Sequence, residues 1–249
     1  MENDWMADTC IEKELDGRNY YLYRHGKNSQ KLPIFYWGIM QNQKDAVDKV
    51  ISYLKAYASD ADFVLVAYVS ENWNDAFSPW ATPPVFGTES FGGKADQTLQ
   101  WLIERIPDIE SDISEYITNT QERLRFIVGY SLAGLFSLWA YCESSVFSGV
   151  VSCSGSFWYD GFMEYIHKQE AAYDRNTKSF IYLSLGDKEE RTKNCRMSSV
   201  KSNTEAIYKL ICEKNNNLKS TFEWNQGGHF SQPDLRVAKG INWVLKNCV

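Results

Sequence analysis

The chain of 249 residues lacks several features that mark large classes of protein. Its longest apolar stretches, such as residues 63–69, are far too short to cross a bilayer, so we expect no membrane partner. The N-terminus has neither the basic nor the apolar region of a secretory signal, and we therefore expect a cytoplasmic protein. Acidic residues (32) outnumber lysine and arginine (26) without any long basic run, which argues against a nucleic-acid partner.

Metal and disulfide signatures are scarce as well. The three histidines (His25, His167 and His229) lie far apart in the sequence, so the spacing of a metal site is missing and we expect no metal. The six cysteines include no CxxC pair, and a chain of this size can bury a core without cross-links, so we expect free thiols. A content of 44% hydrophobic and 23% charged residues is typical of a globular protein, and we expect one domain over residues 1–249.

Strand and helix patterns alternate along the chain. An antiparallel hairpin is predicted first, because Asp16-Gly17 suits a two-residue type I′ turn between 10–15 and 19–23. Further strands are predicted at 32–37, 63–69, 124–128, 149–153, 179–185 and 221–224. Helices are predicted at 44–58, 99–106 (ended by Pro107), 132–141, 161–172, 204–212 and 235–245. This alternation predicts an α/β fold with a mostly parallel central sheet and helices on both faces.

The sequence LRFIVGYSLAGLFSLWA at residues 124–140 carries the clearest chemical signal. A buried strand runs through Gly129-Tyr130-Ser131 into an apolar helix, which is the context of a nucleophile elbow. Small residues at positions −2 and +2, here Gly129 and Ala133, let the strand and helix backbones pass closely. We therefore predict that Ser131 is a nucleophile.

A serine hydroxyl needs a general base and an acid that orients this base. We predict His229 as the base, because it lies on a loop between the last strand and the closing helix. The acid is expected on the loop after the strand 179–185, where Asp187, Glu189 and Glu190 compete. Glu189 is preferred and Asp187 is the alternative, and the order Ser, acid, His is the one found in α/β-hydrolases.

An oxyanion hole and a substrate site should complete this arrangement. We expect one backbone donor at Leu132 and another in the loop after the early strand, at Gly38 and Ile39. Five aromatic residues are expected to contact the substrate: Trp37, Trp73, Trp80, Tyr130 and Trp158. Trp73 and Trp80 belong to residues 71–94, a long irregular segment of the type that is often functional. The alternative is that these rings only pack the segment onto the body of the domain.

These residues resemble the "putative esterase" family of the α/β-hydrolase superfamily, which includes esterase D-like and enterobactin-esterase-like proteins. The resemblance covers nearly the whole chain. The matching segments are 73–75, 78–80, 129–134, 152–158, 185–189 and 228–229. It implies a single-domain α/β-hydrolase fold and a serine hydrolase of carboxylic or thio esters that uses no cofactor. Ser131 matches the nucleophile of the family, His229 the base and Glu189 the acid.

The chain departs from the family pattern at two positions. Trp37-Gly38 stands where the family often has His-Gly, and Ala133 replaces the second glycine of the elbow. We therefore predict a serine carboxylesterase for small or aryl esters, with an acyltransferase or a non-catalytic ligand-binding protein as alternatives. The expected partners are a small-molecule ester and, in a homodimer, a second copy of the chain.

Overall fold

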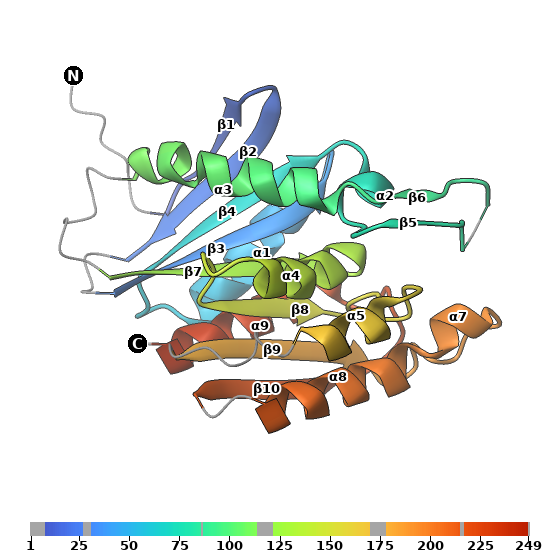
Figure 1. The fold of residues 1–249 in the computed structure, drawn as a ribbon. Helices are drawn as coiled ribbons and strands as arrows, with labels where there is room; N and C mark the ends of the chain where they lie inside the picture. The colour runs from blue at the N-terminus through green and yellow to red at the C-terminus, as the bar shows by residue number, and fades with distance from the viewer. Residues whose placement is uncertain are drawn as a thin grey trace, which may run out of the picture.

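A computed structural model describes residues 8–26, 31–85, 87–113, 122–169, 178–214 and 217–248 (Figure 1). Its centre is an eight-stranded sheet with the order β1-β2-β4-β3-β7-β8-β9-β10. The strands are β1 (Cys10–Leu15), β2 (Arg18–His25), β3 (Lys31–Met40), β4 (Phe63–Ser70), β7 (Glu122–Tyr130), β8 (Gly149–Cys153), β9 (Ser179–Gly186) and β10 (Leu218–Asn225). The helices are α1 (Lys44–Tyr57), α2 (Trp73–Ala76), α3 (Ala95–Ser111), α4 (Leu132–Glu143), α5 (Phe162–Lys168), α7 (Cys195–Ser198), α8 (Val200–Lys214) and α9 (Pro233–Cys248).

The sheet is parallel from β4 through β10, and its first two strands are antiparallel. The hairpin between β1 and β2 turns at Asp16 and Gly17, whose φ angles of 51° and 74° are the positive pair that a type I′ turn requires. These findings confirm the predicted mostly parallel α/β sheet and its N-terminal hairpin.

Helices cover both faces of the sheet, and each layer buries its own core. Helices α3, α4, α5 and α8 pack on one face, and α1 and α9 pack on the other (Figure 1). Strands β4, β8 and β9 are buried at every position, because side chains from both faces of these central strands meet a helix layer. Among the described residues, no helix has both the length and the apolar character needed to cross a membrane.

Three sequence predictions need correction. Helix α3 does not end before Pro107 but continues to Ser111, because Pro107 is on its exposed side while Ile106 and Ile109 are buried. Strand β3 does not end at Trp37 but pairs with β4 as far as Met40. The segment 71–94 contains α2 and a small hairpin of β5 (Ala81–Thr82) and β6 (Phe91–Gly92).

Two predicted helices also have different bounds. Helix α5 ends at Lys168 rather than at 172, and residues 170–172 lie outside the described ranges. The helix predicted at 204–212 begins earlier, at Val200, and follows the short helix α7. The other predicted elements agree to within a few residues. Because β7, β9 and β10 are parallel, their carboxyl ends lie along the same edge of the sheet. Each of these ends is followed by a residue of the predicted site.

Candidate active site

Ser131 occupies a sharp turn between β7 and α4. Its φ of 59° is positive, a conformation that residues other than glycine rarely adopt. The turn is held by the Ser131 N–H, which donates to the Cys153 carbonyl at 3.0 Å. A Cβ atom at Gly129 would lie 2.0 Å from the Ala133 carbonyl oxygen, so only glycine allows strand and helix to approach this closely. The geometry is that of a nucleophile elbow.

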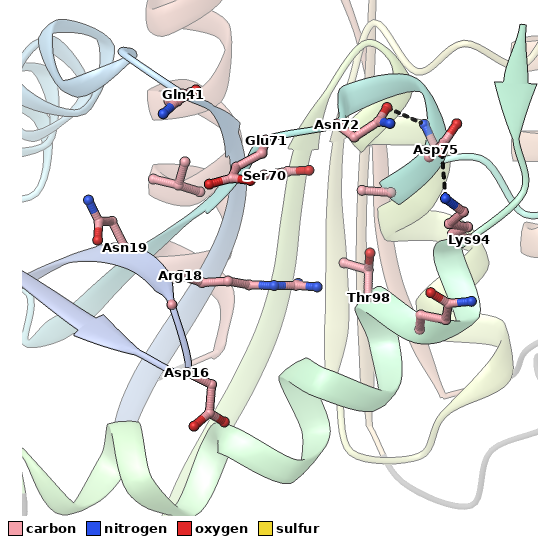
Figure 2. A pocket seen from close by; sticks show the side chains of 14 residues that line it. Asp16, Arg18, Asn19, Gln41, Ser70, Glu71, Asn72, Asp75, Lys94 and Thr98 are labelled. Atoms are coloured by element: carbon pink, nitrogen blue, oxygen red, sulfur yellow. Dashed lines mark hydrogen bonds and ion pairs between the residues drawn. The ribbon is translucent and has the colours of Figure 1, made fainter.

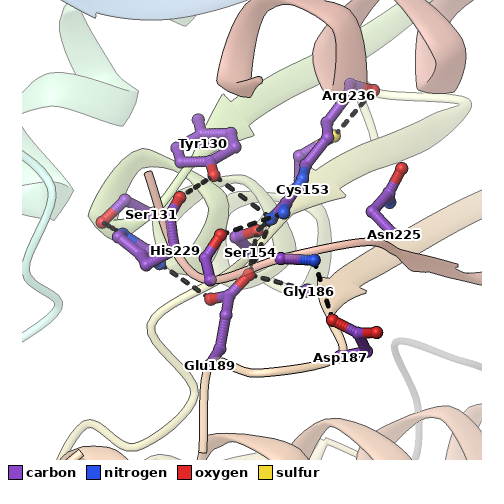
Figure 3. Close-up of polar contacts among 12 residues, drawn as sticks. Tyr130, Ser131, Cys153, Ser154, Gly186, Asp187, Glu189, Asn225, His229 and Arg236 are labelled. Carbon is purple, nitrogen blue, oxygen red and sulfur yellow. Dashed lines mark hydrogen bonds and ion pairs between the residues drawn. The ribbon is translucent and has the colours of Figure 1, made fainter. Parts of the chain in front are cut away.

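His229 lies within hydrogen-bond distance of this serine. Its Nε2 is 2.9 Å from Ser131 Oγ, and its Nδ1 is 2.8 Å from Glu189 Oε2 (Figure 3). A carboxylate accepts hydrogen bonds, so Nδ1–H donates to Glu189 and Nε2 is left to accept from the Ser131 hydroxyl. His25 is not near this serine, and its Nδ1 lies 2.5 Å from Asp8 Oδ1. The three residues from the ends of β7, β9 and β10 therefore form one hydrogen-bonded chain.

Glu189 is held on its second oxygen by three further donors. The Ser154 hydroxyl, the Gly186 N–H and the Arg236 guanidinium donate to Oε1, each at 2.7 Å. Burial raises the pKa of Glu189, but the hydrogen bonds from His229, Ser154 and Gly186 outweigh it, and the pKa lies below its usual value. Glu189 is therefore a fixed anion, with Oε2 directed at the imidazole.

The neighbouring acids contact other groups. Asp187 Oδ1 accepts from the Gly227 N–H at 2.7 Å and so holds the turn that precedes His229. Glu190 Oε1 lies 3.2 Å from Lys201 Nζ near the surface. The structure thus places one of the three candidate acids, Glu189, against His229.

Arg236 is a residue of this site that the sequence analysis missed. It lies on α9 with only 1% of its side chain exposed and donates to Glu189, to Ser154 at 2.8 Å and to the Gly228 carbonyl at 3.0 Å. One signal was present in the sequence: Arg236 shares a face of α9 with Gly240 and Val244 at helical spacing, and all three are buried. An arginine within an apolar stripe needs a buried anion, and Glu189 is that anion.

A pocket of about 500 Å³ opens at Ser131 and His229. Of the five aromatic residues expected to contact substrate, Trp73 and Trp158 line it. Trp37 is buried in the core on the α1/α9 face of the sheet. Trp80 packs on Tyr159 and donates from Nε1 to the Asp160 carbonyl, and it is not among the pocket residues.

Tyr130 does not line the pocket either, but its hydroxyl donates to the His229 carbonyl and helps to fix the histidine loop. The sequence analysis overlooked two aromatic wall residues, Phe91 and Phe230. Phe230 follows His229 and has 90% of its surface exposed at the pocket. Its exposed ring therefore forms part of the pocket wall.

The predicted oxyanion donors have separate positions. Leu132 is the first residue of α4 and lines the pocket beside Ser131, and the N–H groups of a first helical turn have no partner within their helix. Gly38 and Ile39 belong to β3, where they pair with Tyr68 and Val69, and neither lines the pocket. A Cβ at Gly38 would lie 2.7 Å from the Phe77 ring, so this glycine serves close packing.

Within the described ranges, no group of three or more histidine, cysteine, aspartate or glutamate side chains could hold a metal ion. The polar groups around Ser131 are hydroxyl, imidazole and carboxylate side chains in hydrogen-bond contact. Such a set can activate a serine and stabilise the imidazolium that forms when the serine loses its proton.

Known proteins are similar to this chain in sequence and in fold. The chain is 24% identical over 219 residues to the uncharacterized protein YbbA of Bacillus subtilis, an alignment that covers 84% of each chain. Its fold is similar to that of an IroE-like serine hydrolase from Shewanella oneidensis, with a TM-score of 0.75 and 18% identity over 97% of this chain and 81% of the other. The siderophore hydrolase EstA of Aspergillus nidulans is similar with a TM-score of 0.71 and 16% identity, covering 97% and 94% of the two chains.

The family assignment rests on the sequence itself. The model of the family described as "Putative esterase" matches residues 13–232, a range that includes Ser131, Glu189 and His229. This match confirms the resemblance that the motifs indicated. The chain belongs to this esterase family and is an ester hydrolase of the carboxylesterase type on an α/β-hydrolase fold.

Proposed function

We propose that the protein cleaves carboxylic or thio esters of small or aryl acyl groups through an acyl-enzyme formed on Ser131. One observation carries this proposal: the hydrogen-bonded chain Ser131–His229–Glu189, with distances of 2.9 Å and 2.8 Å, opens directly onto a pocket. Serine, base and orienting acid in contact are the requirement for nucleophilic catalysis at neutral pH.

In the proposed mechanism each residue has a role. His229 Nε2 takes the proton as Ser131 Oγ attacks the ester carbonyl, and it returns the proton to the leaving alcohol or thiol. Glu189 stabilises the imidazolium formed in between, because its anionic oxygen accepts from Nδ1. The Leu132 N–H, in the first turn of α4, stabilises the negative charge that develops on the carbonyl oxygen. A water molecule that gives its proton to His229 then attacks the acyl-enzyme. This step releases the acid, and His229 returns the proton to Ser131 Oγ.

The aromatic wall supports the choice of acyl group. Trp73, Phe91, Trp158 and Phe230 surround the opening near Ser131, and flat rings offer offset or edge contacts to an aryl group. The structurally similar EstA is a siderophore hydrolase by name. We therefore expect benzoyl esters to be better substrates than acetyl esters at equal leaving group.

The test is hydrolysis of p-nitrophenyl acetate, butyrate and benzoate by the wild type and by Ser131→Ala, with fluorophosphonate labelling of both. We expect Ser131→Ala to lower kcat/KM by a factor of about 10⁴ or more and to abolish labelling. Ser137→Ala is the matched control, because this buried serine of α4 donates only to the Ala133 carbonyl. A folded wild type that neither turns over an ester nor takes the label would contradict the proposal.

The same assay separates hydrolysis from acyl transfer, which shares the acyl-enzyme. A hydrolase releases benzoate at a rate that added alcohol changes little. Formation of a new ester in proportion to the added alcohol would identify an acyltransferase instead.

A further inference from the structure

A second pocket lies on the other side of α2, away from Ser131. It has a volume of about 420 Å³, within the range of small-molecule sites, and its walls come from the first hairpin, the ends of β3 and β4, and the start of α3 (Figure 2). Helix α2 contributes to both pockets: Trp73 lines the one at Ser131, and Asp75 and Ala76 line this one. The mechanism proposed above uses none of its residues.

Arg18 projects from the hairpin into this pocket (Figure 2). Its guanidinium carbon lies 4.5 Å from the centre of the Trp101 ring. Among the described residues the guanidinium has no ion pair and no hydrogen bond, although the side chain is half-buried and burial lowers its pKa. The charge of Glu71 partly offsets this burial, but no described carboxylate forms an ion pair with the guanidinium, so its fork of N–H donors is available to a ligand.

Two buried polar atoms near this ring also lack partners. Trp101 Nε1 and Tyr68 Oη make no hydrogen bond in the structure, and the rings of Tyr68 and Trp101 have centroids 6.3 Å apart. The nearby start of α3 contributes the positive end of its helix dipole, which Asp96 in the first turn partly offsets. Neither Tyr68 nor Trp101 lines the pocket, so their unpaired atoms belong to the surroundings of Arg18 and not to the pocket wall.

The charges of the wall indicate how many negative charges that anion carries. Of its three acidic residues, Asp75 pairs with Lys94 at 2.8 Å and Asp16 pairs with Arg105. The third, Glu71, is exposed, so solvent screens it without removing its repulsion. Arg18 and Glu71 remain outside these ion pairs. One carboxylate of a ligand can pair with Arg18, whereas a second negative charge would face Glu71 with no further cation of the wall to balance it.

The neutral part of the wall indicates the rest of the ligand. It presents amide and hydroxyl groups from the following residues: Asn19, Gln41, Ser70, Asn72, Gln97 and Thr98. Such groups bind hydroxyls better than alkyl chains. We propose that this pocket binds a small hydroxylated monocarboxylate, of the sugar-acid type, with its carboxylate on the Arg18 guanidinium.

The test uses the whole chain with ¹⁵N-labelled tryptophan and follows the indole N–H signal of Trp101, assigned with Trp101→Phe. D-glucuronate is the probe and D-glucose is its neutral counterpart. We expect glucuronate to shift the Trp101 signal saturably at millimolar concentration, with glucose binding at least about tenfold more weakly. Because the indole signals of Trp73 and Trp158 report on the other pocket, they should not move.

Variants locate the carboxylate. Arg18→Gln should abolish the shift, and Arg18→Lys, which keeps the cation but not the fork, should weaken binding about tenfold. Arg191→Gln is the matched control, because this arginine is exposed and lines neither of the two pockets, and binding should remain. Thermal unfolding checks that each variant is folded, and Arg18→Lys keeps the test decisive if Arg18→Gln does not fold.

Several results would overturn the inference. These are no saturable shift up to about 20 mM glucuronate, equal binding by Arg18→Gln, or shifts at Trp73 and Trp158 in place of Trp101. Inorganic phosphate binding as tightly as glucuronate would overturn the monocarboxylate class. Ser131→Ala should bind glucuronate like the wild type, so this inference stands or falls independently of the proposed esterase mechanism.

Discussion

Two buried glutamates, one at each end of the sheet, have almost the same exposure but different surroundings. Glu110 lies near the start of β7 with 1% of its side chain exposed, and Glu189 follows β9 with 2% exposed. Burial raises the pKa of each, but ion pairs and hydrogen bonds lower it by more, so both pKa values lie below the usual one. Burial and pKa alone therefore do not distinguish a structural acid from a candidate catalytic acid.

The donors around the two carboxylates do distinguish them. Glu110 Oε1 accepts from Arg125 at 2.6 Å and from Tyr36 at 2.9 Å, and Oε2 accepts from Arg123 and Arg125 at 2.8 Å. These donors keep their protons at neutral pH. Glu189 has fixed donors only on Oε1, and Oε2 faces His229. The candidate catalytic acid thus differs from Glu110 in that one of its oxygens accepts from His229, a group that can exchange protons near neutral pH.

Glu189→Gln should have the largest effect on activity. The amide no longer supplies a charge for the imidazolium and can favour the wrong tautomer of His229, so we expect kcat/KM to fall by about 10³- to 10⁴-fold. Steady-state hydrolysis of p-nitrophenyl butyrate measures it, with circular dichroism as the check of folding. A loss below about tenfold would remove Glu189 from the mechanism.

Glu110→Gln should lower the stability of the protein and leave its activity almost unchanged. Arg123 and Arg125 lose their shared anion, and we expect the free energy of unfolding to fall by about 3 kcal/mol, with kcat/KM of the folded protein within about twofold. Urea unfolding followed by fluorescence provides the measurement. A large loss of activity without a loss of stability would contradict the structural role of Glu110.

The pH dependence of stability should also differ between the wild type and Glu110→Gln. The pKa of Glu110 is lower when folded than its ordinary value of 4.5. Its ionised form therefore adds stability at neutral pH, and this contribution is lost as the pH falls from about 4.5 through the lower folded value. Glu110→Gln should lose less stability than the wild type on acidification in this range. Equal slopes for both proteins would contradict the prediction.

Ser154→Ala tests whether the fixed side of Glu189 matters. The hydroxyl donates to Glu189 and accepts from Arg236, and we expect kcat/KM to fall about fivefold because one buried hydrogen bond is worth about 1 kcal/mol. Ser152→Ala is the control two residues earlier, in β8, because its hydroxyl donates to the Gly134 carbonyl instead. Equal losses in the two variants would indicate a general packing effect.

Asp187→Asn should have the smallest effect. The side-chain oxygen of asparagine can still accept from the Gly227 N–H, so we expect kcat/KM to change by less than about twofold. The assay is the one used for Glu189→Gln, at the same pH. A loss as large as that of Glu189→Gln would make Asp187 the acid.

The site was predictable where local sequence dictates local geometry. Ser131 was predicted because a strand, a turn of small residues and a helix follow one another within 124–140. The oxyanion prediction at Gly38 and Ile39 shows the limit. It assumed that the strand ended at Trp37, but pairing with β4 extends β3 to Met40, which the sequence near Gly38 does not reveal.

The sequence by itself determined the α/β alternation, the hairpin turn at Asp16-Gly17 and the elbow at Ser131, since each follows from residues near one another in the chain. Only the tertiary structure decided which of Asp187, Glu189 and Glu190 contacts His229, because these acids differ in neighbours supplied by β8 and α9. It also decided that Arg236 is buried and that Arg18 faces a pocket. Both depend on charges and cavities assembled from distant segments, which no local pattern encodes.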